Sequence, residues 1–235
     1  RIESRGLGDV YKRQHPDRRK TGSDIMASRF DHVVIGAAQL GDAAAIVEAR
    51  LGTDLTGGGK HPLMATHNRL MRLADGYLEV IANDPDAPAP DRVRWYELDN
   101  PETAGRLADG PRALCWVAAV DDIEQAAAGC GYQCGRIIEV TRGDLHWRLT
   151  VPDDGSLAAG GILPALIEWP PGVNPVAALP DSGIALAGLK ASHPDPAMVI
   201  DCLDRLGLGH LMEIAKGAPS LAFFFDTAAG KMLVA

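Results

Sequence analysis

Long hydrophobic runs are missing from this sequence. No stretch of the 235 residues approaches the roughly 20 consecutive apolar residues that a membrane-spanning helix needs. Aromatic residues are also scarce, at 5 %, so few rings are available as stacking platforms. Prolines (16) and glycines (26) interrupt many short apolar runs, which predicts numerous strands and turns rather than a bundle of long helices. We therefore expect a globular protein that does not span a membrane.

Positive charge is scarce beyond residue 25. The formal net charge is -8, and the first 25 residues hold seven Lys and Arg against four Asp and Glu. The remainder therefore has 16 Lys and Arg against 27 Asp and Glu. Nucleic acids and anionic membranes need clustered cations, so neither is an expected partner. A small-molecule substrate is the expected partner instead.

The basic head and the few cysteines limit the fold and its location. Residues 1–25 contain no apolar run of signal-peptide length, and we expect them to be a non-native or disordered tail, with the fold starting at Met26. The four cysteines are scattered, which predicts free thiols and a cytoplasmic location; they are Cys115, Cys130, Cys134 and Cys202. Catalytic signatures such as Gly-x-Ser-x-Gly, the Walker A loop and Gly-x-Gly-x-x-Gly after a strand are missing.

One pattern occurs three times in the chain: an apolar strand, a helix, and then two or three more strands. The copies fall in residues 26–110, 111–180 and 181–235, and the third is expected to be a structural C-terminal extension. The predicted fold class is α+β. Residues 83–111, a long proline-rich segment around Trp95 and Tyr96, are expected to be a lid or a linker between modules.

Two glutamates lie in the middle of apolar strands. Glu79 in "YLEVIA" and Glu168 in "ALIEW" are expensive to bury unless they are paired, hydrogen-bonded or bound to a cation. Together with His32 they predict a site for a divalent ion such as Zn, Fe, Mn or Ni. In the alternative, each acid faces solvent or pairs with a cation, namely Arg72, Arg148 or Lys60.

The stretch "KHPLMATHNRLMRL" (60–73) supplies further polar candidates. Pro62 predicts an extended turn that places His61 at a strand edge. His67 and Asn68 are adjacent in the next strand and must point to opposite faces, although the pattern does not decide which one faces inward. These three residues are expected either to contact substrate or to be purely structural.

These residues together resemble a known family. Paired strand-helix-strand-strand-strand modules with "DHVVIGA", "GGGKHPLMATHNRLMRL" and "YLEVIANDP" are similar to the glyoxalase-like domain family of the vicinal oxygen chelate superfamily. The resemblance covers residues 30–170 and implies that two modules form an open, cupped sheet around the active site. It also implies that two copies can associate as a homodimer.

The resemblance implies a metal-ligand set as well. Metal-dependent members offer a first-strand His or Gln and a last-strand Glu from each module, which here correspond to His32, Glu79 and Glu168. Cys115 stands at the remaining first-strand position, where a thiolate could bind zinc or a thiol could simply be buried. His146, placed on the inward face of "LHWRLTV", could replace it.

Two functions follow as hypotheses. The first is a lyase, isomerase or ring-cleaving oxygenase in which Glu79 or Glu168, with a raised pKa, is the catalytic base and Arg148 holds a substrate carboxylate. The second is a metal-free protein that binds a small molecule in the same cup. The expected substrate contacts for either function are His61, His67, Asn68, Trp95, His146 and Arg148.

Overall fold

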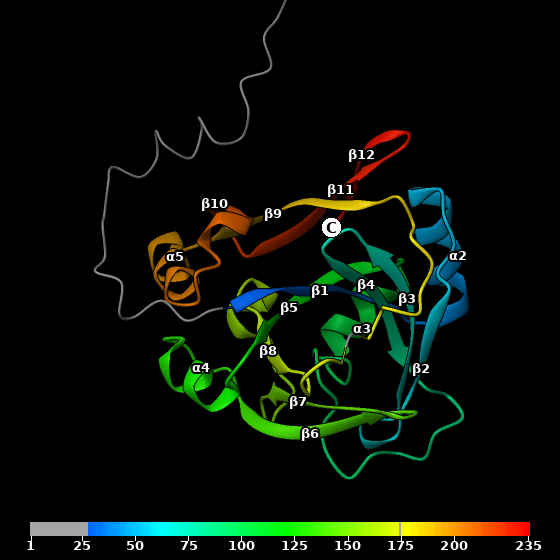
Figure 1. Cartoon of the computed structure of the whole chain (residues 1–235), viewed down its shortest axis with the longest axis horizontal. Helices are drawn as coiled ribbons and strands as arrows, with labels where there is room; N and C mark the ends of the chain where they lie inside the picture. Colours follow the sequence, from blue (N-terminus) through cyan, green and yellow to red (C-terminus); the bar gives the residue numbers. More distant parts are fainter. Residues whose placement is uncertain (1–27, 174) are drawn as a thin grey trace, which may run out of the picture.

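The computed structural model describes residues 28–173 and 175–235. The tail predicted for residues 1–25 lies outside the described residues. Two strand-rich modules and a third unit make up the described chain (Figure 1). Within this part of the chain, no helix is both long and apolar enough to cross a membrane.

The elements follow the predicted order. The first module consists of β1 (Ser28–Gly36), α2 (Leu40–Leu51), β2 (Gly57–His61), the 3-10 helix η1 (Pro62–Met64), β3 (Thr66–Leu73) and β4 (Gly76–Asn83). A connection containing α3 (Pro101–Ala108) leads to β5 (Arg112–Val120), α4 (Ile123–Gly129), β6 (Arg136–Arg142), β7 (Leu145–Val151), η2 (Ala158–Gly161) and β8 (Ala165–Glu168). The third unit consists of β9 (Ala185–His193), α5 (Pro196–Arg205), η3 (Gly209–Leu211), β10 (Met212–Lys216), β11 (Ser220–Thr227) and β12 (Gly230–Val234).

Local sequence explains where the helices begin and end. The Asp122 side chain accepts from the Gln125 backbone N–H (2.9 Å) at the start of α4, and Asp195 accepts from Met198 (3.2 Å) at the start of α5. Gly52 ends α2 in the left-handed region (φ 77°), which glycine adopts without steric cost. Asp42 lies in the first turn of α2, where its negative charge interacts favourably with the positive end of the helix dipole.

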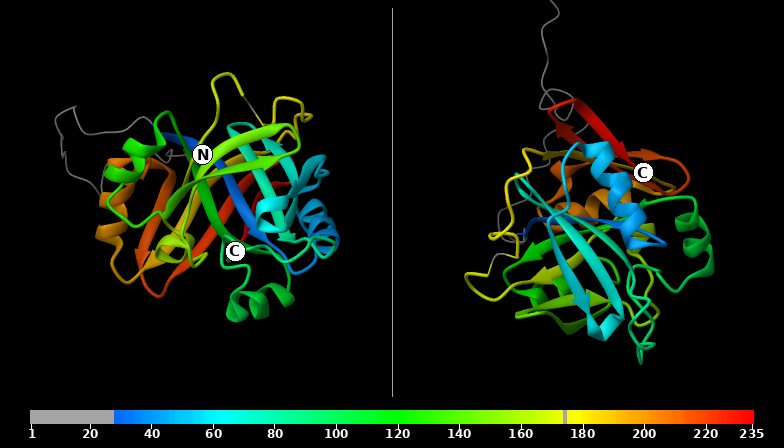
Figure 2. Two further views of the ribbon diagram at one scale, coloured as in Figure 1. Left: turned by 90° about the horizontal axis from the view of Figure 1, so that it is seen from below. Right: turned by 90° about the vertical axis from the view of Figure 1, so that its right-hand side faces the viewer.

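The first two modules form one eight-stranded sheet. Its strand order is β2-β3-β4-β1-β5-β8-β7-β6, and the modules join through the antiparallel pair β1 and β5. The sheet is strongly curved (Figure 2). Its outermost strands lie close together, as a Cβ built on Gly59 of β2 would lie only 3.0 Å from Cγ of Arg142 in β6. The predicted paired βαβββ modules with a cupped sheet are confirmed.

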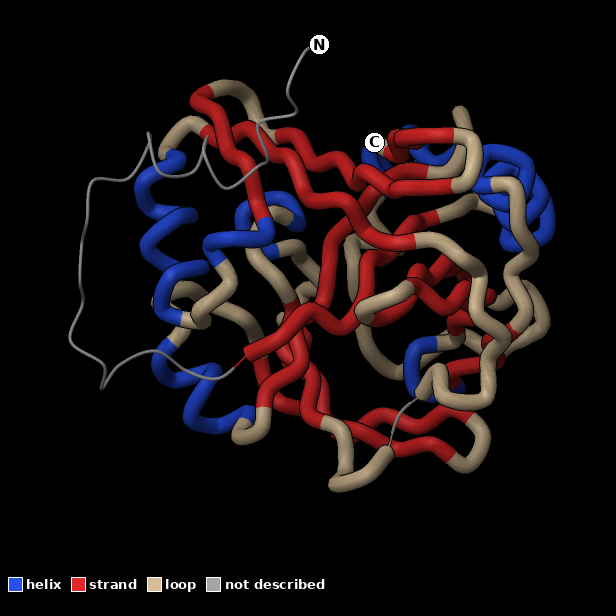
Figure 3. Tube along the Cα trace, turned by 45° about the horizontal axis from the view of Figure 1, so that its top comes forward, coloured by secondary structure: helices blue, strands red, loops and turns tan. Residues whose placement is uncertain are grey.

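The C-terminal extension repeats the order of elements but not the order of strands. Its sheet runs β10-β9-β11-β12, so β10, the strand that follows the helix, pairs in parallel with the first strand, β9. In both modules it is the last strand that pairs in parallel with the first strand. Its apolar residues share one core with α2, α4 and the outer face of the large sheet. In Figure 3 the helices lie at the periphery of the crossing strands. The extension thus covers the outer face and leaves the cup to the two modules.

Alternation along the strands separates two apolar layers. Val33 and Ile35 of β1 pack into the outer core, and Val34, with Val117 of β5, packs into the layer that lines the cup. Functional side chains in the cup must therefore share the parity of Val34 and Val117. This rule decides which predicted site residues meet.

Candidate active site

His32 lies on the cup face of β1, held by the residue that precedes it. Its Nδ1 is 2.7 Å from Oδ1 of Asp31, and the other Asp31 oxygen accepts from Trp169 Nε1 at 3.0 Å. Adjacent strand residues normally point to opposite faces, but the β1-β5 pairing shifts register between Phe30 and His32. Irregularities of this kind re-aim side chains near active sites, so the shift accounts for how Asp31 and His32 meet.

His32 and Glu79 form a buried ion pair at the floor of the cup. Nε2 of His32 lies 3.6 Å from Oε2 of Glu79, and the imidazole stacks on Tyr77 at 4.3 Å. Burial works against the charge of His32, but hydrogen bonds to Asp31 and Glu79 outweigh it and raise the His32 pKa. Burial likewise works against the charge of Glu79, yet His32 and Asn68 lower its pKa to about 2. The prediction of a raised Glu79 pKa is therefore wrong, because it left out the imidazolium partner.

Asn68 on β3 and His61 on β2 continue the His32-Glu79 pair toward the β2 edge of the sheet. The Asn68 amide donates to Oε1 of Glu79 and lies 3.5 Å from His61 Nε2, while His61 Nδ1 lies 3.1 Å from Oγ1 of Thr66. His61 is buried, and desolvation lowers its pKa to about 4, so it is neutral at pH 7. Asn68 faces the cup and His67 the outer side, which resolves the alternative left open by the sequence.

His61 should make folding stability depend on pH. Below pH 6.5 the unfolded chain protonates this histidine, whereas the folded protein does so only near pH 4, so stability falls as the pH drops through this interval. Urea unfolding between pH 4.5 and 6.5 should show a slope approaching about 1.4 kcal/mol per pH unit, with less slope in His61→Gln. His146→Gln, which changes an exposed histidine, is the matched control. An identical slope in wild type and His61→Gln would contradict this assignment.

Arg142 brings a positive charge into the cup without an acid of its own. It is only 9 % exposed and lines the cavity that also contains His32, His61 and Glu79. Its guanidinium carbon lies 6.0 Å from the centre of the Trp147 ring. Among the described residues, no ion pair or hydrogen bond to this guanidinium is present. A largely buried arginine without an acid partner is expensive, so its position needs a functional reason.

The connection between β4 and α3 covers the cup. Trp95 is 3 % exposed, stacks with Tyr96 at 5.3 Å and lies edge-on to His61 at 5.1 Å. The cavity beneath these rings has a volume of about 20 Å³, which is room for about one water molecule. We call residues 84–100 the lid because Trp95 and Tyr96 cover this cavity, and a lid function for residues 83–111 stays a prediction. A larger ligand can enter only if Trp95 and Tyr96 move.

Besides His67, three more predicted site residues lie outside the cup. Glu168 shares the parity of outer-face Leu166, accepts from the Ile123 backbone N–H (2.9 Å) and pairs with Arg148 (Nε to Oε1, 3.0 Å). Arg148 also contacts Glu124 of α4, and His146 is exposed on the same side of β7. The apolar side chains of β7 face the cup instead, where they pack in one apolar cluster with the lid and Trp169. The assignments of Glu168, Arg148 and His146 to the cup are thus corrected.

The register explains why the second module offers no acid. Glu79 pairs with Val34 in the first module, and Ala165 pairs with Val117 in the second. Because α2 and α4 begin 83 residues apart, Val117 is the counterpart of Val34, and Ala165 is the counterpart of Glu79. Glu168 lies three residues after Ala165 and therefore corresponds to outer-face Ala82, which lies three residues after Glu79. A four-ligand centre would therefore have His32 and Glu79 on one side, but only Cys115 and Ala165 on the other.

This donor set does not fit the divalent metal implied by the resemblance. Burial raises the pKa of the Cys115 thiol well above its usual range, and Ala165 offers no donor atom at the fourth position. Nε2 of His32 is engaged with Glu79, and Nδ1 with Asp31. Throughout residues 28–173 and 175–235, no group of three or more His, Cys, Asp and Glu is arranged to hold a metal ion.

The fold and the cup define a protein of the vicinal oxygen chelate class, with paired βαβββ modules around one site. Residues 30–207 match the family model of the glyoxalase-like domain. The chain therefore belongs to the glyoxalase-like domain family, as the resemblance implied.

Solved structures share parts of this fold. A hypothetical protein from Staphylococcus aureus is 12 % identical with a TM-score of 0.55, and the match covers 88 % of this chain and 84 % of that one. Methylmalonyl-CoA epimerase from Mycobacterium tuberculosis is 21 % identical with a TM-score of 0.40, covering 66 % and 95 %. A methylmalonyl-CoA epimerase in complex with methylmalonyl-CoA and NH4+ is 18 % identical with a TM-score of 0.41, covering 63 % and 99 %. No curated protein matches the chain significantly.

Proposed function

We propose that the cup binds a small organic carboxylate and transfers a proton on it without a metal ion. The observation that carries this proposal is the buried Arg142 guanidinium, which has no acid partner among the described residues and lines the same cavity as the His32-Glu79 pair. Arginine recognises planar anions through paired N–H donors, and burial strengthens such contacts. The ligand carboxylate would supply the acid partner that Arg142 lacks among the described residues.

The charges in the cup favour a carboxylate over a phosphate. Among the described residues that line the cup, only Arg142 is a cation without an acid partner, and Asp31 and Glu79 already supply negative charge around His32. A ligand with a single negative charge neutralises Arg142. A doubly charged phosphate would add negative charge beside two carboxylates with no further cation to offset it.

The His32-Glu79 pair has the protonation states that a proton transfer needs. The pKa of Glu79 is lowered to about 2, so at pH 7 this acid is charged and able to accept a proton, and the raised pKa of His32 favours the imidazolium form that can donate one. Glu79 would remove a proton from carbon next to the bound carboxyl or carbonyl group, while His32 protonates the developing oxygen. Asp31 fixes the His32 ring and supports its charge.

Binding without turnover is the second candidate. The Glu79 pKa of about 2 favours it, since so weak a base removes a carbon-bound proton poorly unless the ligand changes its surroundings. The same cup and the same Arg142 would then act as a receptor for the carboxylate.

A ligand screen followed by isotope exchange tests the proposal and separates the two candidates. Small carboxylic acids should raise the melting temperature by several degrees, neutral amides of the same shape should not, and prior treatment with EDTA should change neither result. Proton NMR in D2O should then show enzyme-dependent loss of a carbon-bound proton in a stabilising acid. Exchange supports the enzyme, and stabilisation without exchange supports the receptor. If only added Zn, Mn, Ni or Fe allows stabilisation, metal-independent recognition is wrong.

A further inference from the structure

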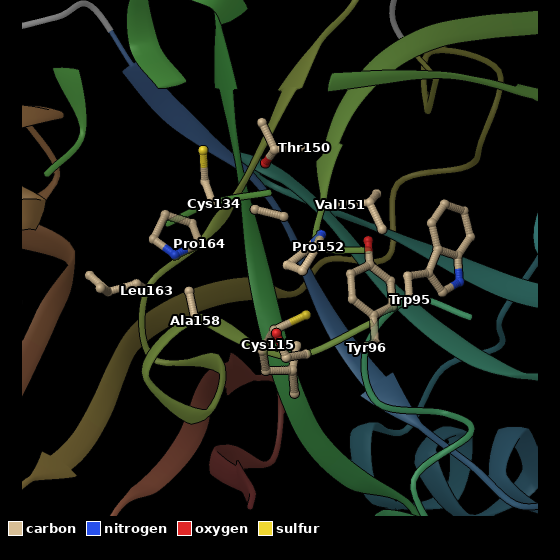
Figure 4. Close-up of a pocket in the computed structure, with 13 residues that line it drawn as sticks. Trp95, Tyr96, Cys115, Cys134, Thr150, Val151, Pro152, Ala158, Leu163 and Pro164 are labelled. Carbon is tan, nitrogen blue, oxygen red and sulfur yellow. The ribbon is translucent and has the colours of Figure 1, made fainter. Parts of the chain in front are cut away.

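A second cavity lies behind the lid, next to the first. It also has a volume of about 20 Å³, and it extends from Trp95 and Tyr96 to Cys115, Leu163 and Ala165 in the second module. In Figure 4 the Tyr96 ring lies between Trp95 and Cys115. Trp95 and Tyr96 line both cavities, so these two rings are the wall between the two spaces.

The wall itself is held in an unfavourable state. Tyr96 and Glu97 both adopt left-handed backbone conformations, with φ of 59° and 56°, although neither is glycine. The Trp95 Nε1 donor is buried and has no hydrogen-bond partner in the described structure. Residues that pack inward at such a cost are suited to moving out when a ligand replaces them.

We propose that the substrate is a carboxylate carrying a flat aromatic group, and that this group takes the place of the Trp95 and Tyr96 rings. The inference rests on the proposed function, since Arg142 must bind the carboxylate end. With the rings displaced, both cavities join into one elongated site with Arg142 at one end and Ala165 at the other.

The lining of this site fits an aromatic body. The place that Trp95 occupies is already shaped for a ring, edge-on to His61 at 5.1 Å and close to Trp147, which itself lies 6.0 Å from His61. None of the described residues lining the second cavity carries an acid or a basic side chain. An uncharged, apolar group is therefore the part of the ligand that belongs there.

Titration calorimetry with paired acids tests this inference. Benzoate and phenylacetate should bind wild-type protein at least ten-fold more tightly than acetate. Ala165→Leu, which adds bulk to the second cavity, should remove this advantage. Cys115→Met fills the same space from β5 and replaces Ala165→Leu if that variant does not fold. The matched control is Ala222→Leu on β11 of the extension, away from the cup.

Fluorescence gives an independent readout of ring displacement. Saturating benzoate should change the tryptophan emission of wild type, and Trp95→Phe should remove most of that change, although three tryptophans remain. Equal affinity for benzoate and acetate, or aromatic acids binding Ala165→Leu and Cys115→Met as tightly as wild type, would overturn the aromatic subsite and leave the proposed function standing. If neither acetate nor any aromatic acid binds, the proposed function itself fails.

Discussion

Replacing Glu79 by glutamine should abolish proton transfer while sparing ligand binding. The glutamine oxygen can still accept from Asn68, but the base is lost and His32 loses one of its two carboxylate partners. We expect isotope exchange to slow by about 10²- to 10⁴-fold, the usual contribution of a positioned acid or base. The free energy of unfolding at pH 7 should fall by roughly 3 kcal/mol, since a buried charge loses a partner. Carboxylate affinity should stay within a few-fold of wild type, because Arg142 is intact.

Glu168→Gln is the matched control for this variant. Glu168 binds the start of α4 and Arg148 on the outer face, so its replacement should cost some stability and leave exchange at the wild-type rate. A Glu79→Gln protein that exchanges as fast as wild type, or a Glu168→Gln protein as slow as Glu79→Gln, would contradict the placement of the acid-base pair.

Replacing Arg142 by methionine should stabilise the ligand-free protein and remove its ligand affinity. In the free protein a buried guanidinium lacks an acid partner, so an apolar side chain of similar length should raise the free energy of unfolding by roughly 1–2 kcal/mol. Carboxylate affinity should fall by about 100-fold or more, because a buried charge-assisted contact is lost. Chemical unfolding without ligand and calorimetry with ligand measure the two effects on one variant.

Arg148→Met is the control that distinguishes the two arginines. It breaks the contacts with Glu168 and Glu124, so it should lower stability and keep the affinity for the carboxylate. The opposite result, with Arg148→Met losing the ligand and Arg142→Met keeping it, would place the anion site at Arg148 instead of Arg142.

The sequence predicted the fold well because the fold follows from patterns that recur along the chain. Strand alternation, helix capping at Asp122 and Asp195, and the likeness of the two modules each specify local structure. The strand order of the extension was beyond this reasoning, since its element order equals that of the modules. Which strand pairs with β9 depends on how the extension packs over the outer face, and no local signal reports that.

The sequence predicted only the part of the candidate site that the first module contributes. The structure brings His32, Glu79, His61 and Asn68 together, whereas it places Glu168 on the outer face. The type of each side chain suggested its role, but the pairing register of the strands decides which face of the sheet it lies on. Ala165 holds the cup position in β8, and Glu168, three residues further along the strand, lies on the outer face.

Two functional residues were missed, for different reasons. Arg142 shares the parity of Ile138 and Val140 in "RIIEVTR", so the alternation contained a signal for a cation on the cup face. Asp31 could not have been found in this way, because normal alternation separates it from His32 and only the register shift in β1 unites them.

We propose above all that Arg142 recognises a carboxylate beside the His32-Glu79 pair without a metal. The most direct measurement is calorimetric titration of EDTA-treated wild type and Arg142→Gln with the carboxylic acid that most stabilises the wild type. We expect one molecule bound per chain, the same affinity before and after EDTA, and a loss of affinity of about 100-fold or more in Arg142→Gln. Equal affinity in the two proteins, or binding that returns only when a divalent metal is added, would contradict it.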